Sequence, residues 1–254
     1  MVQHPDPRQN RILAALPLDA YLHLGPFFEP IELKLGDSLA EPGTRMSYAY
    51  FPTDSIVSLV CGTGDGASTE ISVVGTEGVV GVPLFMGGGI GTNSAIVTSA
   101  GSAYRIRGPL LKAEFFRMGP LHELLLRYTQ ALFTQIAQTA LCNRYHSLDQ
   151  QLCRWLLLSL DRLTTNELHM TQELIANMLG VRREGVTQSA CKLQKAGLIS
   201  YHRGRIAILD RHGLEARACE CYGVINKEYE RLICYYPPRN KGIDPSTLLR
   251  ATVQ

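Results

Sequence analysis

Residues 171–209 have the sequence TQELIANMLGVRREGVTQSACKLQKAGLISYHRGRIAIL. Thr171 can cap a helix here, because its hydroxyl can accept a hydrogen bond from a backbone N–H group that the helix leaves free. The apolar residues that follow recur on one helical face, namely Leu174, Ile175, Met178 and Leu179. Gly180 can then adopt a left-handed conformation at no steric cost. The stretch therefore begins with a short amphipathic helix that ends at Gly180.

A second amphipathic run follows at once and ends at Gly197. Its apolar stripe consists of Val186, Ala190 and Leu193. Its polar side consists of Arg183, Glu184, Thr187, Gln188 and Cys191. Two short apolar runs, residues 198–199 and 206–209, come next, and His202-Arg203-Gly204-Arg205 joins them in a pattern typical of a small hairpin. Helix, glycine turn, helix and hairpin together predict a winged helix-turn-helix.

The positive charge of the chain is concentrated in this stretch. From Arg182 to Arg205 there are six Lys or Arg residues and one acidic residue, whereas the whole chain has a net charge of only +2. A surface that neutralises DNA phosphates needs such a local excess. A helical hairpin with a solvated basic face would also explain the charge, but it would not explain the glycine stops and the hairpin. The combination favours DNA binding.

Residues 171–187 and 193–199 resemble the helix-turn-helix signature of the Crp/Fnr (catabolite activator) transcription regulators. This resemblance implies that Arg183, Glu184 and Gln188 reach base edges. Arg183 suits a guanine, through two hydrogen bonds to O6 and N7, and Glu184 can accept one from a cytosine amine. Gln188 stands where the best-known members have Arg, and Gln could instead read adenine.

The same resemblance implies the partners of the protein. A helix-turn-helix that reads a two-fold symmetric site needs a second copy, so we expect a homodimer on double-stranded DNA, with RNA polymerase as a further partner. The residues predicted to contact DNA phosphates are Arg182, Thr187, Lys192, Arg203 and Arg205. The predicted function is sequence-specific transcription regulation rather than catalysis.

The 254 residues can hold two modest domains with separate cores. Short helices are predicted between Asn10 and Phe28, and short β-rich runs separated by Gly, Pro and Asp extend from Ile31 to Arg107. Strands are predicted at residues 49–52, 55–60, 70–74 and 94–98. Such short, regularly spaced strands favour a β-roll or jelly roll. The predicted fold class is α+β, with an N-terminal β-roll (jelly-roll) sensor domain, a long dimerisation helix and a C-terminal winged helix-turn-helix.

Two segments, residues 36–43 and 49–52, resemble the family's sensor barrel, which often binds a cyclic nucleotide. In such members an Arg binds the phosphate and a nearby Glu binds the ribose. The resemblance places Val82 at the Glu position and Asn93 near the Arg position. Without the Arg, a cyclic phosphate loses strong charge-assisted hydrogen bonds. Cyclic AMP binding of the usual kind is therefore not expected.

The identity of a small-molecule effector stays open. The resemblance implies that its pocket would be formed by Gly81, Val82, Asn93, Ser94, Gln135 and Ile136. The glycines between Gly87 and Gly91 form either an anion-binding nest or a flexible hairpin tip. No Lys-Ser/Thr follows them, which excludes a nucleotide P-loop.

A long helix free of internal Gly and Pro is predicted from Pro120 to Asn143. A heptad seam runs along it, formed by Leu121, Leu125, Tyr128, Leu132, Gln135, Thr139 and Cys142. The seam favours a dimer helix, and the alternative is a helix that packs only on its own barrel. Residues 143–146 are predicted to be a hinge, and Ser147 with Gln150 predicts a capping box on the next helix. The predicted domains are a sensor at 1–118, a dimerisation helix and hinge at 119–145, a winged helix-turn-helix at 146–236 and a tail at 237–254.

Neither a metal nor another cofactor is expected. A metal-dependent barrel enzyme needs clustered His and carboxylate ligands, yet no His lies between His23 and His122. A further helix is predicted from Leu214 to Ile233. Cys219 and Cys221 lie two residues apart on it, and this step does not place side chains on one helical face.

The seven cysteines are odd in number and show no disulfide-like spacing, so a reducing cytoplasm is the expected location. No apolar run approaches the length of a membrane span, and the start of the chain has no signal-peptide core. The rival interpretation, from another class of protein, is a sensor-only or enzymatic barrel whose C-terminal domain mediates assembly rather than DNA binding.

Overall fold

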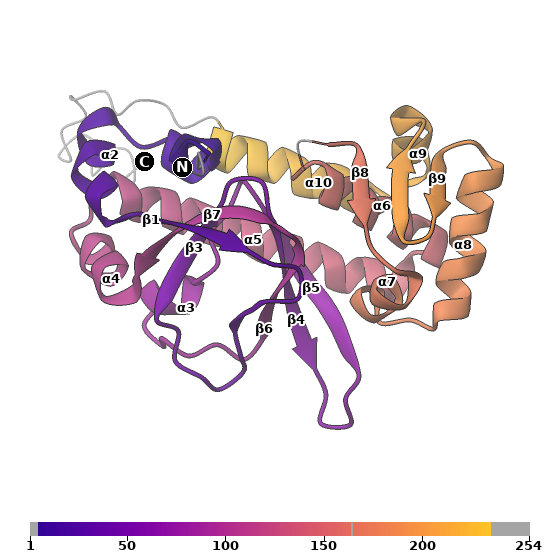
Figure 1. The fold of residues 1–254 in the computed structure, drawn as a ribbon, viewed down its shortest axis with the longest axis horizontal. Helices are drawn as coiled ribbons and strands as arrows, with labels where there is room; N and C mark the ends of the chain where they lie inside the picture. The colour runs from indigo at the N-terminus through magenta and orange to yellow at the C-terminus, as the bar shows by residue number, and fades with distance from the viewer. Residues whose placement is uncertain (1–4, 164, 235–254) are drawn as a thin grey trace, which may run out of the picture.

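The computed structural model describes residues 5–163 and 165–234, and the predicted tail at 237–254 lies outside them. The described chain forms a β-roll and a second, mainly helical lobe, and helix α5 (Pro120–Tyr145) runs from one toward the other (Figure 1). Among the described residues, no helix is both long enough and apolar enough to cross a membrane.

Short helices form at the N-terminus, as predicted between Asn10 and Phe28. They are η1 (Pro7–Gln9), α1 (Arg11–Ala14), α2 (Leu18–Leu24) and η2 (Gly25–Phe27). Asn10 caps α1 with its side-chain oxygen. Its buried Nδ2 donates to the backbone oxygens of Pro52 and Gly78, at 3.0 and 2.8 Å. This one side chain therefore starts the helix and fixes it to the β-roll.

The β-roll consists of antiparallel strands in two sheets, ordered β1-β7-β3 and β2-β6-β4-β5. The strands are β1 (Glu29–Leu33), β2 (Ser38–Ala40), β3 (Tyr48–Pro52), β4 (Ile56–Gly62), β5 (Ser68–Val74), β6 (Ser94–Ser99) and β7 (Gly101–Arg107). The four predicted strands correspond to β3, β4, β5 and β6. By contrast β1 has the sequence EPIEL, whose composition does not mark a strand. It forms at a sheet edge, where Pro is tolerated.

Helix α3 (Val82–Phe85) lies between β5 and β6 in the chain, and helix α4 (Gly108–Phe116) connects β7 to α5. The heptad seam predicted on α5 faces the rest of its own chain. The structure buries every seam residue within its own chain: Leu121, Leu125, Tyr128, Leu132, Gln135, Thr139 and Cys142. They face the β-roll and helix α10 (Glu220–Tyr229), so the prediction of a dimer seam on this face is wrong. Heptad spacing marks a buried stripe, and it does not identify what covers the stripe.

The second lobe, called the reader lobe (residues 148–217), confirms the predicted winged helix-turn-helix. Its elements are α6 (Leu148–Leu160), β8 (Glu167–His169), α7 (Gln172–Leu179), α8 (Arg183–Lys195), β9 (Ile199–His202), β10 (Arg205–Ile208) and α9 (Arg211–Arg217). The hydroxyl of Thr171 accepts from the backbone N–H of Leu174 at 3.2 Å, which confirms the predicted cap of α7. Gly180 ends that helix in the left-handed conformation, at φ 65° and ψ 36°. Ser147 and Gln150 form the predicted capping box at the start of α6.

The wing is the hairpin of β9 and β10, and a third strand that the sequence did not predict joins it. Strand β8 pairs with β10, so the sheet order is β8-β10-β9. Arg203 and Gly204 form the turn between β9 and β10 and have φ values of 47° and 80°. Two successive positive φ values define a type I′ turn, whose twist suits a hairpin. Strand β8 was not predicted because its three residues are too few to show an alternation of apolar and polar side chains.

The single helix predicted from Leu214 to Ile233 is wrong. Ala218 and Cys219 have extended backbone, with ψ values of 158° and 165°, and they separate α9 from α10. Helix α10 continues into the π-helical turn η3 (Glu230–Cys234). It packs along α5 (Figure 1) and contributes Ile225 and Tyr229 to the core of the β-roll. The end of the described chain therefore returns to the sensor side of the molecule.

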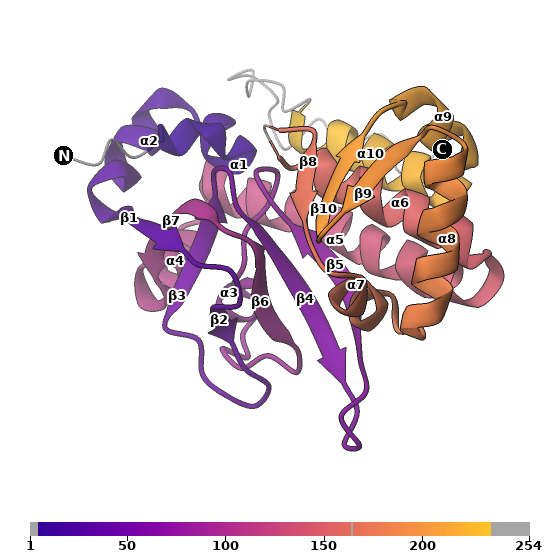
Figure 2. The ribbon, with the colours of Figure 1, turned by 45° about the vertical axis from the view of Figure 1, so that its right-hand side comes forward.

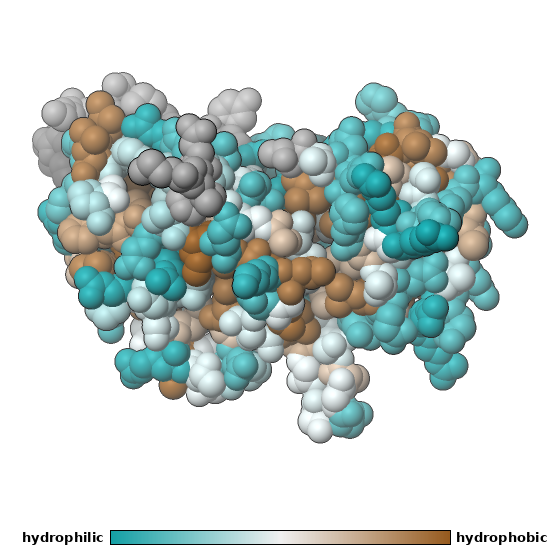
Figure 3. Space-filling view, in the orientation of Figure 1, coloured by the Kyte–Doolittle hydropathy of each residue, from teal (hydrophilic) through white to brown (hydrophobic). Residues whose placement is uncertain are grey.

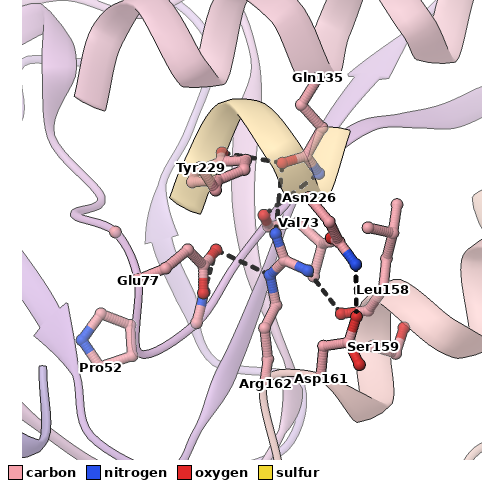
Figure 4. Close-up of polar contacts among 12 residues, drawn as sticks. Pro52, Val73, Glu77, Gln135, Leu158, Ser159, Asp161, Arg162, Asn226 and Tyr229 are labelled. Atoms are coloured by element: carbon pink, nitrogen blue, oxygen red, sulfur yellow. Dashed lines mark hydrogen bonds and ion pairs between the residues drawn. The ribbon is translucent and has the colours of Figure 1, made fainter. Parts of the chain in front are cut away.

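A buried ion pair lies where the β-roll meets the reader lobe (Figure 4). Arg162, just beyond α6, donates from Nε to Glu77 Oε1 at 2.7 Å, and the two side chains are 4% and 6% exposed. Arg162 also donates to the backbone oxygen of Leu158. Two charges removed from water are tolerated only when they are well paired and hydrogen-bonded.

Gln135 completes this buried network. Its side-chain oxygen accepts from the Tyr229 hydroxyl at 2.9 Å and from Arg162 Nη2 at 3.4 Å. Its side-chain nitrogen donates to the backbone oxygen of Val73 at 3.3 Å. The network therefore connects α5, β5, the end of α6 and α10.

We expect Glu77→Ala to lower the free energy of unfolding by about 3–5 kcal/mol, because it leaves the Arg162 charge buried without its partner. Urea denaturation followed by circular dichroism measures the change. Glu29→Ala is the matched control, since Glu29 pairs with Arg105 at the surface and its side chain is 46% exposed. Glu29→Ala should lower the free energy of unfolding by no more than about 1 kcal/mol. Equal losses of stability in the two variants would contradict the role given to the buried pair.

Candidate nucleic-acid interface

Helix α8 presents one face to its own lobe and the other to solvent. Val186, Ser189, Ala190 and Leu193 are buried on the inner face. Arg182, Arg183, Glu184 and Gln188 are all exposed on the outer face. Figure 2 shows α8 at the outer edge of the molecule beside the wing strands. In Figure 3 this end of the molecule is mostly hydrophilic on the visible face.

The three predicted base-reading residues lie in the first two turns of α8, so they share one exposed surface. Arg183 Nε lies 4.0 Å from Glu173 Oε2, and both side chains are 64% exposed. An ion pair this open contributes little to stability. The guanidinium of Arg183 can therefore exchange Glu173 for a base edge at small cost.

Thr187 has a role that the sequence did not predict. Its hydroxyl donates to Gln172 Oε1 at 2.6 Å and also lies 3.0 Å from the backbone oxygen of Arg183. The first of these contacts connects α8 to the start of α7. Gln172 gave no sequence signal for this contact, because the partner side chain lies 15 positions away.

Two of the predicted phosphate contacts are paired with carboxylates in the free protein. Lys192 Nζ lies 2.9 Å from Asp149 Oδ2, and Arg205 Nε donates to Glu167 Oε2 at 2.7 Å. A hydrogen bond from Ser189, followed by the interaction with Lys192, lowers the pKa of Asp149. The side chains of Lys192 and Arg205 are 62% and 60% exposed, so a phosphate can compete for both of them.

The wing is fixed to the start of α7 by two hydrogen bonds. The Tyr201 hydroxyl donates to the backbone oxygen of Met170 at 2.7 Å, and the backbone N–H of Met170 donates to Gly204 at 2.6 Å. A groove between the wing and the helices is lined by Thr171, Gln172, Glu173, Arg183, Tyr201, Arg203 and Gly204. Arg203 sits in the wing turn and is exposed. The groove thus has a basic residue on each side, one from α8 and one from the wing.

The β4–β5 hairpin carries the β-roll into contact with the reader lobe. Trp155 on α6 donates from Nε1 to Glu70 Oε1 at 3.0 Å. Thr69 donates to the backbone oxygen of Met178 at 3.3 Å, beside the left-handed Gly180. Val60 of β4 belongs to the hydrophobic core of the reader lobe. A displacement of this hairpin would therefore act directly on α6 and α7.

The residues predicted to line an effector pocket are distributed over two regions. Gly81 is the residue before α3 and packs closely on Ala49, and Val82 is the first residue of α3. Asn93 lies directly before β6, and Ser94 is its first residue. Ile136 is half-buried and packs against the core of the β-roll. Gln135 is engaged by Val73, Arg162 and Tyr229, so a ligand that used its amide would have to replace those bonds.

The glycine run is held in place rather than free. The Gly89 N–H donates to the backbone oxygen of Pro83 at 2.7 Å. Met46 donates to the carbonyl of Gly89, and Gly43 donates to that of Gly91. These bonds attach the run to residues 43–46 and use one of the N–H groups that an anion nest would need.

Residues able to hold a metal ion lie where α5 ends and α10 begins. The ligand atoms of Cys142, His146, Cys219 and Cys221 all lie within 4.8 Å of one another. The prediction that Cys219 and Cys221 cannot converge is wrong, because Cys219 is the extended residue before α10 and not part of the helix.

The family model of the Crp-like helix-turn-helix domain matches residues 150–217. A regulator described as of the Crp/Fnr family, from Eubacterium rectale, superposes with a TM-score of 0.64 at 19% identity, covering 81% of this chain and 96% of its own. The chain is Crp/Fnr-like. It has the fold of the Crp/Fnr transcription regulators, and its reader lobe is a Crp-like helix-turn-helix domain.

Other solved structures share the Crp/Fnr-like fold. FixK2 from Bradyrhizobium japonicum has a TM-score of 0.64 at 14% identity, covering 76% of this chain and 98% of its own. The c-di-GMP responsive regulator CLP from Xanthomonas campestris has a TM-score of 0.56 at 15% identity, covering 78% of this chain and 96% of its own. No curated protein matches this chain. At these identities the likeness establishes the fold, and it does not transfer an effector.

Burial raises the pKa of Glu70 from 4.5 to about 7, although the hydrogen bond from Ser58 and the charge of Arg154 act in the opposite direction. The folded protein therefore holds this proton more tightly than the unfolded chain, and stability falls as the pH rises from about 4.5 to 7. We expect this group alone to reduce the free energy of unfolding by about 3 kcal/mol across that range.

The check is urea denaturation at several pH values, for the wild type and for Glu70→Gln. Gln keeps the size of the side chain and removes the titration. As the pH rises from about 4.5 to 7, the wild type should therefore lose stability relative to the variant. A difference that stays constant from pH 5 to about pH 8 would show that Glu70 does not titrate in this window.

Proposed function

We propose that this Crp/Fnr-like protein is a homodimeric transcription regulator that binds two-fold symmetric sites in double-stranded DNA. The observation that carries the proposal is the outer face of α8, where Arg182, Arg183, Glu184 and Gln188 are exposed while the inner face is buried. A helix built this way can enter a major groove without disturbing its own core. The chain then acts by binding rather than by catalysis.

Within this proposal, Arg183, Glu184 and Gln188 read bases, and the wing and helix flanks hold the phosphates. Arg203 is well placed for a phosphate, because it lies in the wing turn across the groove from Arg183. Arg182, Lys192 and Arg205 are exposed basic side chains around the same surface. Thr187 can add a phosphate contact only if its hydroxyl leaves Gln172.

We propose that the dimer forms through a different face of α5 from the predicted seam. The exposed face has its own heptad pattern, formed by Leu126, Gln130, Phe133, Ala137 and Ala140. Phe133 is 73% exposed and Leu126 is 43% exposed. Gln130 donates to Glu228 of α10, and the other four residues are apolar. A mainly apolar stripe with small Ala residues suits close packing of two helices. Two reader lobes held by such a pair could address successive major grooves, about 34 Å apart.

We propose further that the β-roll (residues 1–118) controls the reader lobe (residues 148–217) through the helix and hinge at 119–145. The contacts of the β4–β5 hairpin with α6 and α7 support a direct mechanical connection. An effector would bind at one of the two regions described above, either beside Gly81, Val82, Asn93 and Ser94 or at the α5 segment that contains Ile136. RNA polymerase is the proposed further partner, and the cytoplasm is the proposed location because the DNA target lies there.

The proposal is tested by selecting bound duplexes from a random pool in gel-shift titrations of the full chain. Recovery of a two-fold symmetric motif supports it. Failure to retain any duplex at low ionic strength, where phosphate contacts are strongest, would decide instead for a C-terminal domain that mediates assembly.

We expect Arg183→Ala to weaken binding to the selected site by about 1–3 kcal/mol and to relax selectivity at one base pair, with little effect on random DNA. Arg203→Ala should weaken binding to every sequence and should reduce the salt slope by about one, as loss of one phosphate contact does. Arg8→Ala, an exposed Arg in η1, is the control and should change neither quantity. Titrations at several salt concentrations measure both effects. Identical behaviour of the Arg183 and Arg203 variants would refute the assigned division of roles.

We expect Phe133→Glu to weaken dimerisation by a factor of about 100 or more, because it brings unpaired carboxylates into an apolar contact. Sedimentation equilibrium over a concentration series measures the association. Phe116→Glu is the matched control, since Phe116 is a comparably exposed Phe, at 61%, on α4. Dissociation by the Phe116 variant alone would place the dimer contact elsewhere.

A further inference from the structure

Four side chains that the DNA interface does not use converge where α5 ends and α10 begins. Cys142 lies in the last turn of α5, His146 is the residue that ends α5, and Cys219 and Cys221 flank the first residue of α10. The three cysteines are buried, at 0%, 5% and 0% exposure, and form a core cluster of their own. The His146 side chain is 13% exposed.

The spacing of the four ligand atoms is close to that of a tetrahedral metal site. Cys142 Sγ lies 3.5 Å from Cys219 Sγ, and Cys221 Sγ lies 3.6 Å from His146 Nδ1. A tetrahedral Zn²⁺ ion, with bonds of ~2.3 Å to sulfur and ~2.0 Å to nitrogen, sets its ligand atoms roughly 3.6–3.8 Å apart. The longest separation in the cluster is no more than 4.8 Å, so a small contraction completes the tetrahedron.

The surroundings of His146 also fit a metal ligand. Its Nε2 lies 3.3 Å from Glu220 Oε1, which leaves Nδ1 directed at Cys221. A carboxylate on the second nitrogen is the usual way in which a protein orients a ligating imidazole. Gln151 Nε2 donates to the backbone oxygens of Cys142 and His146, at 3.3 and 2.9 Å, and so holds the end of α5 in place.

Arg154 supplies the charge that such a site needs. Its side chain is buried, with 3% of the residue exposed, and its Nε has no hydrogen-bond partner within the described part of the chain. Its Nη1 donates to Thr139 Oγ1 at 3.3 Å, which places the guanidinium one turn before Cys142 on α5. Three thiolates, a neutral imidazole and a divalent ion carry one net negative charge, which a neighbouring guanidinium offsets.

We propose that Cys142, His146, Cys219 and Cys221 form a structural binding site for a thiophilic divalent cation, with Zn²⁺ as the ion that the donor set fits best. Three sulfurs and one nitrogen exclude Mg²⁺ and Ca²⁺, which require oxygen ligands. Four protein ligands leave no open position, as in structural rather than catalytic zinc sites. The ion would clamp the end of α5 to the start of α10, directly at the His146–Ser147 junction with α6. This proposal does not depend on the proposed function.

The test uses the full-length chain, purified under reducing conditions and analysed for bound metal. We expect about one Zn²⁺ per chain, and a Co²⁺-loaded sample should show the visible absorption of tetrahedral Co²⁺ with thiolate charge-transfer bands. Cys219→Ser and Cys221→Ser should lose both signals. Cys191→Ser is the matched control, because Cys191 is exposed on α8 outside the cluster, and it should keep both.

Two further variants keep the test decisive if a cysteine variant fails to fold. His146→Cys should retain the ion with stronger thiolate absorption, since it offers four sulfurs. Glu220→Gln should weaken Zn²⁺ affinity by about 10-fold, the usual cost of removing such a second partner. In the wild type, chelation of the ion should lower the thermal midpoint, because binding energy contributes to folding.

The proposal is overturned if protein whose thiols titrate as free binds neither Zn²⁺ nor Co²⁺. It is also overturned if Cys191→Ser loses the metal while Cys219→Ser and Cys221→Ser retain it. In reduced protein supplied with Zn²⁺ and then exposed to air, a Cys142–Cys219 disulfide that forms with dioxygen as the oxidant, in place of metal binding, would assign the pair to redox chemistry and would equally overturn the proposal.

Discussion

The buried ion pair between Arg162 and Glu77 fixes how the β-roll meets the reader lobe. A charge left unpaired in an interior that excludes water is costly, so the contact between the two groups favours one arrangement of the β-roll and the reader lobe. Gln135 and Tyr229 extend the network to α5 and α10. The sensor side and the reader side are therefore joined by a polar contact, and a signal between them must leave this contact intact or replace its partners.

Further contacts between the β-roll and the reader lobe are made by β4 and β5. Glu70 reaches Trp155 of α6, and Thr69 reaches the end of α7, so the same hairpin touches both the start of the reader lobe and its helix-turn-helix. The junction between α5 and α6 is only two residues long, His146 and Ser147. The cysteine and histidine cluster lies at this junction. A movement of the reader lobe would therefore disturb both the contacts of the hairpin and this junction.

Local signals in the sequence were reliable wherever a few neighbouring residues decide the conformation. Thr171, Gly180 and Ser147 start or end their helices as predicted, because a cap or a left-handed glycine depends on the adjacent backbone alone. The outer face of α8 was predicted for the same reason, since helical periodicity separates its polar residues from the apolar stripe. The Crp/Fnr-like fold followed from this stretch and from the short strands of the β-roll.

The sequence by itself determined the winged helix-turn-helix, the β-roll and the exposed polar face of α8. Only the tertiary structure decided what covers the heptad seam of α5 and which groups bind the Gln135 side chain. It also decided that Cys219 and Cys221 meet Cys142 and His146. The reason is physical: periodicity shows that a face is buried but not by what, and a break of two residues before α10 redirects side chains that a continuous helix would keep apart. Contacts between residues more than 70 positions apart, such as Cys142 with Cys219, arise only when the chain has folded back on itself.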